Sequence, residues 1–248
     1  MKKINSVLII GATSSIANEV ARLYAVQKCD LTLLARNEEK LKEIKSDLTA
    51  RGAKSVKCLS GNLASKKTIE ELFTKATASG SYDLVLIAYG VLCEQEKMEQ
   101  KPELIADVIN TNFTSVTLWC EKTVNFLNEK NNGCLAVIGS VAGDRGRKKN
   151  YVYGSTKAAL DSYLQGLTQR FDDTGVHILT IKPGFIDTPM TDKFDKGGPL
   201  WAKPEDVAQD IVKAIDKNKR VIYTPWFWFF IMFVIKQLPY FIFKRLPI

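Results

Sequence analysis

The sequence has little of the residues that build metal centres and disulfide frameworks. Its 248 residues include one histidine and five cysteines. The histidine, His177, lies inside an apolar, strand-like stretch, so we interpret it as an interior side chain and not as an acid or a ligand. The cysteines are odd in number and show no Cys-x-x-Cys spacing; they are Cys29, Cys58, Cys93, Cys120 and Cys134. This usage predicts a reduced cytosolic protein without a disulfide or a bound metal.

The chain also lacks a hydrophobic run long enough to cross a bilayer. The longest run, from Trp226 to Ile235, has ten apolar residues. As a helix it would span ~15 Å, about half of the ~30 Å hydrocarbon thickness. The first ten residues superficially resemble a signal peptide, but their apolar part is short and leads into a glycine turn, which is typical of a first strand.

No recognised nucleic-acid motif accompanies the net charge of +8. The lysines and arginines are scattered along the chain, so we expect no nucleic-acid partner. Anionic cofactors, phosphorylated substrates or an acidic membrane surface account for this charge better.

Strand-like runs alternate with helix-length stretches. The runs are Val7 to Ile10, Leu31 to Ala35, Val56 to Ser60, Leu84 to Ala88, Leu135 to Gly139 and Val176 to Lys182, with a short last strand at Val221 to Thr224. The alternation predicts an α/β fold with a Rossmann-type, doubly wound parallel sheet. At this length we expect a single domain of residues 1–225 and an apolar, aromatic C-terminal extension of residues 226–248. Ligands of such sheets bind beyond the carboxyl ends of the strands.

The stretch from Ser140 to Lys157 carries the residues with the clearest chemical pattern. Ser140 follows a short apolar run that suits a buried strand, and Tyr153 and Lys157 stand four apart at the start of a helical pattern, on one face. A phenol has an unperturbed pKa of ~10, and a neighbouring ammonium is expected to lower it toward neutral pH. With a serine hydroxyl to hold a carbonyl oxygen, these groups suit carbonyl reduction or alcohol oxidation by hydride transfer.

Two other Tyr-x-x-x-Lys matches show that the spacing alone is weak evidence. Tyr24 with Lys28 and Tyr240 with Lys244 have the same spacing. The positions 13 residues before these tyrosines are a glycine and a phenylalanine, whereas 13 residues before Tyr153 stands a serine. Only the match of Tyr153 with Lys157 therefore has a credible site around it.

On these residues the chain resembles the short-chain dehydrogenase/reductase family over nearly its whole length. The resemblance implies a catalytic tetrad of Asn112, Ser140, Tyr153 and Lys157, in which Asn112 holds a water that relays protons to the lysine. More narrowly, residues 88–92, 153–158 and 243–248 resemble the decaprenylphosphoryl-2-keto-ribose reductases. That subgroup implies reduction of a lipid-linked keto sugar in bacterial envelope synthesis. The keto sugar would need a partner oxidase to form it, and we also expect a homo-oligomer.

The resemblance also implies which residues bind the dinucleotide. They are Gly11, Thr13, Ser14, Ser15, Ile16, Arg36, Asn62, Leu63, Ala88, Gly90, Tyr153, Lys157, Pro183, Gly184, Ile186 and Thr188. The first turn keeps one glycine of the usual three, and Tyr89 departs from the family pattern. Arg36 favours NADP(H) because a guanidinium grips the extra phosphate that a carboxylate would repel. The alternatives are an exposed arginine at a helix start and, for Asn62, a simple turn residue.

Four cations in five positions lie between Ser140 and Tyr153. They are Arg145, Arg147, Lys148 and Lys149. Either they keep a loop solvated, or one or two of them bind a phosphate on the substrate. The glycine-rich stretch of residues 191–201 is expected to be a mobile lid.

The C-terminal segment from Trp226 to Ile248 allows two interpretations. Its aromatics, followed by Lys236, Lys244 and Arg245, suit a segment in a membrane interface. The same surface would also suit an oligomer contact or packing on the protein's own core. We therefore expect an NADPH-dependent reductase in the cytoplasm, free or peripheral on the inner face of the membrane. The rivals are a soluble reductase of a free ketone, sterol or acyl chain and a non-catalytic dinucleotide-binding protein.

Overall fold

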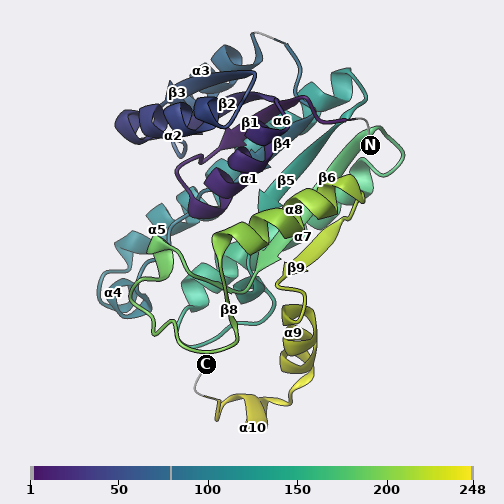
Figure 1. Cartoon of the computed structure of the whole chain (residues 1–248). Helices are drawn as coiled ribbons and strands as arrows, with labels where there is room; N and C mark the ends of the chain where they lie inside the picture. The colour runs from purple at the N-terminus through teal and green to yellow at the C-terminus, as the bar shows by residue number, and fades with distance from the viewer. Residues whose placement is uncertain (1–2, 79, 247–248) are drawn as a thin grey trace.

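The computed structural model describes residues 3–78 and 80–246, which fold around a seven-stranded parallel sheet (Figure 1). The strand order is β3-β2-β1-β4-β5-β6-β9. The strands are β1 (Ser6–Ile10), β2 (Asp30–Ala35), β3 (Ser55–Ser60), β4 (Leu84–Ile87), β5 (Gly133–Ile138), β6 (Val176–Pro183) and β9 (Val221–Thr224). Each predicted strand is present, with ends that differ by at most two residues from the prediction. The predicted doubly wound fold is confirmed.

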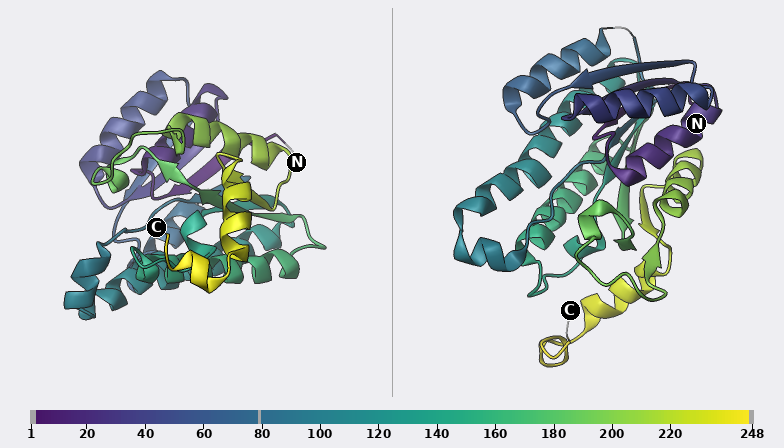
Figure 2. Two further views of the ribbon diagram at one scale, coloured as in Figure 1. Left: turned by 90° about the horizontal axis from the view of Figure 1, so that it is seen from below. Right: turned by 60° about the vertical axis from the view of Figure 1, so that its left-hand side comes forward.

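Helices cover both faces of this sheet (Figures 1 and 2). One face is covered by α1 (Ser15–Val26), α2 (Glu38–Ala50) and α8 (Pro204–Asp216), and the other by α3 (Lys66–Thr77), α6 (Ser115–Glu129) and α7 (Tyr151–Arg170). Within β1, Val7 and Ile9 pack on the first face and Leu8 and Ile10 on the second. A strand buried on both faces is apolar throughout, which is why these runs are continuous in the sequence.

The remaining elements are short and lie toward the carboxyl ends of the strands. They are α4 (Gln95–Gln100), α5 (Glu103–Ile109), the π-helical turn η1 (Asn110–Thr114), the 3-10 turns η2 (Val141–Gly143) and η3 (Pro189–Thr191), the strand pair β7 (Phe185–Ile186) and β8 (Trp201–Ala202), and the C-terminal helices α9 (Trp228–Gln237) and α10 (Tyr240–Phe243). The chain order of the sheet reverses between β1 and β4, and a doubly wound sheet binds its ligand at this crevice.

The last two helices extend from β9 past the carboxyl edge of the sheet (Figure 1). Trp228 and Met232 lie one turn apart on α9 and are buried with Val141, whereas the next residues, Phe229 and Phe233, are exposed. In the part of the chain that the structure describes, no helix is both long and apolar enough to span a membrane. The C-terminal extension is therefore a docked amphipathic element beside the loop that carries Ser140.

Candidate active site

The three central residues of the predicted site come together at the carboxyl end of β5. Ser140 lies two residues beyond the end of this strand, and its hydroxyl hydrogen-bonds Tyr153 in the first turn of α7. One turn later, Lys157 Nζ lies 5.8 Å from the centroid of the Tyr153 ring and donates a 3.0 Å hydrogen bond to the carbonyl oxygen of Ile138. A Cβ at Gly143 would lie 2.7 Å from the Lys157 carbonyl carbon, so glycine is needed where the loop meets α7.

The pKa of the Tyr153 phenol differs from the sequence-based prediction. Burial raises this pKa above its usual value, while the hydrogen bond with Ser140 and the positive charge of Arg147 oppose the rise. Lys157 is itself deeply buried, and burial lowers its pKa to about 8. The expected net lowering of the phenol pKa toward neutrality is therefore wrong for this structure, because burial outweighs the groups that favour the phenolate. A phenol with a raised pKa stays protonated at neutral pH, which is the form that donates a proton.

Asn112 is fixed where the long helix is interrupted. The sequence predicts one continuous helix from Pro102 to about residue 125, but the structure inserts the π-turn η1 between α5 and α6. The Asn112 side chain accepts from the Val91 amide and donates to the Val91 carbonyl, both at 2.8 Å. A Cβ at Gly90 would lie 3.0 Å from Asn112 Oδ1 and 3.9 Å from Lys157 Nζ. Asn112 is thus buried beside Lys157.

The turn between β1 and α1 has the donors that a dinucleotide pyrophosphate requires. Gly11 has a φ of +96°, and a Cβ there would lie 2.8 Å from the Cβ of Tyr89. The Ser14 side chain makes no capping hydrogen bond at the start of α1. Because the first amides of a helix have no acceptor within the helix, this end of α1 keeps free donors for an anion. The residues therefore fit the pyrophosphate of a dinucleotide.

Two other predicted cofactor residues lie at the ends of β2 and β3. Arg36 is exposed directly after β2, a position that suits either of its two interpretations. Asn62 is also exposed, and its Oδ1 accepts a 3.0 Å hydrogen bond from the Ala64 amide. This contact makes Asn62 a turn residue, and its amide nitrogen remains for an adenine edge.

Tyr89, which the sequence left unexplained, connects three elements around the cofactor crevice. Its hydroxyl lies 2.8 Å from Ser115 Oγ on α6 and donates to the Leu63 carbonyl at 3.2 Å. The same carbonyl accepts a 3.0 Å hydrogen bond from the indole of Trp119. Leu63 is therefore held in place through its main chain. Sequence alone gives no sign of this role, because the partners of Tyr89 are 26 residues away on either side.

The remaining predicted cofactor residues lie between the end of β6 and the start of η3. They are Pro183, Gly184, Ile186 and Thr188. A Cβ at Gly184 would lie 1.9 Å from Trp228 Nε1 of α9. Phe185 packs edge-on against the same indole with ring centroids 4.9 Å apart. The sequence did not predict that the C-terminal helix packs against this segment. The stretch of residues 191–201, our expected lid, follows and is largely exposed, and its mobility stays a prediction.

The four cations after Ser140 do not form one exposed basic surface. Arg145 donates to the carbonyls of Ile235 and Leu238 at the end of α9, and its guanidinium lies 3.8 Å from the centroid of the Phe243 ring. Arg147 is buried, whereas Lys148 and Lys149 are exposed. Arg145 therefore holds the C-terminal helix, and the hypothesis that one or two of the four cations bind a substrate phosphate stays a prediction.

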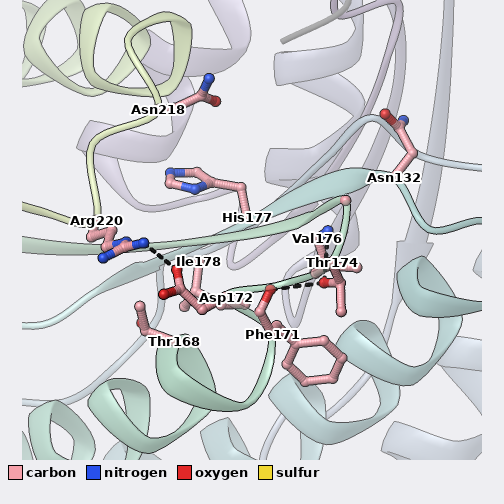
Figure 3. Close-up of a pocket in the computed structure, with 11 residues that line it drawn as sticks. Asn132, Thr168, Phe171, Asp172, Thr174, Val176, His177, Ile178, Asn218 and Arg220 are labelled. Atoms are coloured by element: carbon pink, nitrogen blue, oxygen red, sulfur yellow. Dashed lines mark hydrogen bonds and ion pairs between the residues drawn. The ribbon is translucent and has the colours of Figure 1, made fainter.

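His177 lies far from this site, in a pocket of about 370 Å³ near the amino end of β6 (Figure 3). Its Nε2 is 2.9 Å from the Lys219 carbonyl oxygen, and burial lowers its pKa. The ring is half-buried and has a backbone partner, which agrees with a structural role. Among the described residues, no cluster of three or more His, Cys, Asp or Glu side chains has the arrangement to hold a metal ion.

Comparison with known proteins decides the family. Residues 5–198 match the model of the short chain dehydrogenase family. The chain belongs to the short-chain dehydrogenase/reductase family. It is therefore an oxidoreductase, as are its relatives by name. An uncharacterized oxidoreductase of Mycobacterium tuberculosis is 31% identical over 242 residues, covering 97% of this chain and 96% of the relative. One from Streptomyces coelicolor is 30% identical over 247 residues, covering 98% and 96%.

Solved structures of this short-chain dehydrogenase/reductase family have the same fold. A short-chain dehydrogenase from Sphingobium yanoikuyae in complex with NADPH has a TM-score of 0.83 at 22% identity, covering 90% of this chain and 88% of that one. An actinorhodin polyketide ketoreductase variant with NADPH has a TM-score of 0.77 at 23% identity, covering 86% and 90%. At these identities the likeness is one of fold.

Proposed function

We propose that the protein is an NADPH-dependent reductase of a keto sugar carried on a polyprenyl phosphate, in bacterial cell-envelope or polysaccharide synthesis. The observation that supports the lipid carrier is the position of α9. Its buried face packs against Val141, next to Ser140, and its other face exposes Phe229, Phe230 and Phe233. An apolar surface this close to the reacting groups suits a substrate whose sugar is polar and whose carrier is not.

The residues of the site divide the reduction between them. When bound, NADPH supplies the hydride that adds to the carbonyl carbon. The Ser140 hydroxyl holds the carbonyl oxygen, and Tyr153 gives its proton to that oxygen as the alcohol forms. Lys157 holds the cofactor ribose and returns a proton to the phenolate, through a water beside Asn112. The overall change is one hydride and one proton added across the C=O bond.

Arg36 provides the test of NADPH preference. We expect Arg36→Ala to raise KM for NADPH by about 10- to 100-fold, because a charged hydrogen bond to the 2′-phosphate is lost. KM for NADH should not change. Steady-state kinetics with both cofactors measure the difference, and Lys40→Ala, which removes an exposed cation from the first turn of the following helix α2, is the control. Equal changes for both cofactors would show that Arg36 does not contact the phosphate.

The exposed residues of the C-terminal segment support binding of the protein to the anionic inner surface of the membrane. Aromatic side chains at Trp226, Phe230 and Phe233 are exposed. The exposed cation Lys236 lies in α9, and the exposed cation Lys244 directly follows α10. Aromatic rings at the level of the headgroups and cations beside acidic lipids are typical of interfacial helices. The enzyme would then act as a peripheral protein.

Two further partners belong to this proposal. A keto sugar on a lipid carrier must be made by oxidation of a hydroxyl, so a partner oxidase would supply the substrate and the pair would invert one carbon. A second copy of the chain is supported by the apolar groove between α5 and α7, a pocket of about 280 Å³ lined by Ile105, Ile109, Tyr151 and Val152 among others.

The deciding experiment is mass spectrometry of the lipid-linked sugars in cells that lack the protein. We expect a polyprenyl-phosphate keto sugar to accumulate, one hydrogen pair lighter than the missing product. The purified full-length protein with NADPH should convert that lipid into the product. An unchanged lipid profile would contradict the proposal, and efficient turnover of free ketones, sterols or acyl chains would favour a soluble reductase instead.

A further inference from the structure

Lys182 is a buried lysine that lies between two aspartates at the end of β6. Its side chain is only 7% exposed, and its ammonium donates hydrogen bonds of 2.8 Å to Asp144 Oδ1 and 2.9 Å to Asp161 Oδ2. The Asp144 side chain is 1% exposed and that of Asp161 is 19% exposed. Taking charges out of water is costly, and apolar side chains of similar volume are often equally stable or more stable. A contribution to stability therefore does not by itself account for this arrangement.

Asp144 fixes the turn that begins after Ser140. This turn, η2, is short, and its hydrogen bonds are long: the Gly143 amide donates to the Ser140 carbonyl at 3.2 Å. The Asp144 amide donates to the Val141 carbonyl, also at 3.2 Å. A single 3-10 turn has little rigidity of its own. The Asp144 carboxylate adds a bond to Lys182 on β6 and, through Oδ2, a 2.7 Å hydrogen bond from the Tyr223 hydroxyl on β9.

Asp161 and Lys182 lie on segments that carry predicted catalytic and cofactor residues. Asp161 stands one turn after Lys157 on α7, so its ion pair with Lys182 limits rotation of this helix about its own axis. Asp161 Oδ2 also accepts a 3.0 Å hydrogen bond from Gln165, one turn further on. Lys182 itself directly precedes Pro183, which is predicted to bind the cofactor. One ammonium therefore connects three segments whose alignment hydride transfer requires.

The charge of Lys182 persists across neutral pH. Burial by itself would lower the pKa of this lysine, but the hydrogen bonds and negative charges of Asp144 and Asp161 raise the pKa overall. Burial raises the pKa of Tyr223 to about 12, and the hydrogen bond to Asp144 acts in the same direction, so this hydroxyl remains a donor. The four side chains are therefore a fixed support and not a pH switch.

We propose that Lys182 is a positioning residue that holds the turn after Ser140 and helix α7 in register with the cofactor segment. The inference rests on the proposed function, in which Ser140 and Tyr153 act on the carbonyl oxygen. Hydride transfer tolerates little error, and a displacement of about 1 Å can lower the rate about 10²-fold. Charged hydrogen bonds fix such distances because they are directional. Lys182 acts through Asp144 and Asp161 and is not itself a reacting group.

The test is a series of substitutions in the full-length protein. Lys182→Met removes both ion pairs and keeps a side chain of similar length, and it should lower kcat about 10- to 100-fold. Asp144→Asn removes one ion pair and should lower kcat about 10-fold, whereas Tyr223→Phe removes one hydrogen bond and should lower it about threefold. The double variant of Lys182→Met and Asp144→Asn should be no slower than Lys182→Met, because both substitutions break the same link.

Two readouts separate positioning from stability. The first is kcat per folded molecule with a synthetic short-chain prenyl-phosphoryl keto sugar as the probe, and the Kd for NADPH, titrated separately, should change far less than kcat. The second needs no substrate. The amides of Ala142, Gly143 and Asp144 should exchange faster with solvent in Lys182→Met and Asp144→Asn, under conditions where both variants stay folded.

The matched controls lie at the opposite edge of the sheet. Leu48→Ala opens a cavity near the end of α2, so it should lower the midpoint of thermal unfolding and leave kcat and the turn amides unchanged. Lys54→Met removes a lysine from an exposed ion pair, in which Lys54 Nζ lies 2.7 Å from Asp30 Oδ2 just before β3. This variant should change neither kcat nor the exchange of the turn amides.

Three outcomes would overturn the inference. One is a wild-type kcat per folded molecule in Lys182→Met and Asp144→Asn, which would leave only a contribution to stability. Another is additive losses of kcat in the double variant, which would show that the two residues act separately. The third is unchanged exchange of the turn amides. If Lys182→Met does not fold, Asp144→Asn and Tyr223→Phe decide the matter. A wild-type protein that does not reduce the probe would contradict the proposed substrate, and the exchange measurement would then decide this inference alone.

Discussion

Replacing Tyr153 by phenylalanine is expected to lower kcat by about 10²- to 10⁴-fold, the usual contribution of a general acid. The ring remains and still packs against Ser140 and Lys157, so the fold should be nearly unchanged and the affinity for NADPH should change far less than kcat. What is lost is the one proton at the end of the phenol. Single-turnover NADPH oxidation measures the chemical step, and fluorescence titration measures cofactor binding.

Tyr24→Phe is the matched control for this substitution. Tyr24 begins another Tyr-x-x-x-Lys match but is buried on α1, and its hydroxyl has no hydrogen-bond partner among the described residues. Removing an unpaired buried hydroxyl should leave stability equal or slightly higher, and activity unchanged. A similar loss of rate in both variants would contradict the assignment. Intact biological function of Tyr153→Phe would favour a non-catalytic dinucleotide-binding protein.

Replacing Trp228 by alanine is expected to weaken the docking of α9 by about 3 to 5 kcal/mol, the range for deleting a buried aromatic side chain. Trp228 is only 3% exposed and contacts Gly184, Phe185 and the cluster around Met232. Without the indole, the amides of α9 should exchange faster with solvent and the bond after Lys236 should be cleaved faster by trypsin. Hydrogen exchange and limited proteolysis measure both changes.

Trp226→Ala tests the other surface of the same segment. Trp226 is 70% exposed and lies two residues before Trp228. Its removal should change stability by about 0.5 kcal/mol or less. Co-sedimentation of the full-length protein with anionic liposomes should fall, because an interfacial aromatic is lost. If neither the wild-type protein nor this variant binds the liposomes, the membrane proposal is wrong and the exposed face belongs to a protein contact.

The parts of the fold that local patterns determine were predictable. Continuous apolar runs indicated the strands, because a strand that is buried on both faces has apolar residues throughout. The succession of strands and helices along the chain indicated the parallel sheet. The positions of Ser140 and Tyr153 followed from the same reasoning, since each stands at the edge of a well-marked element. The environment of Asn112 in the π-turn was not predictable, because its side chain makes two hydrogen bonds to Val91, 21 residues earlier, which the local sequence does not show.

The charged residues near the site were the least predictable. In the sequence Arg145 and Arg147 are close neighbours in a basic loop, yet one holds the end of α9 and the other is buried. Their partners are set by tertiary structure, which spacing in the chain does not encode. The pKa of Tyr153 depends on burial more than on the nearby lysine, and burial at a single position is likewise a property of the whole fold.

The contact between α9 and the loop after Ser140 changes how the tail should be studied. Truncation before Trp226 would remove the carbonyls that Arg145 binds and would uncover the apolar side chain of Val141. A shortened enzyme that loses activity would then report a disordered catalytic loop, whether or not lipids matter. Substitutions confined to the outward side of the helix, such as Phe230→Glu, leave those supports in place and separate the two effects.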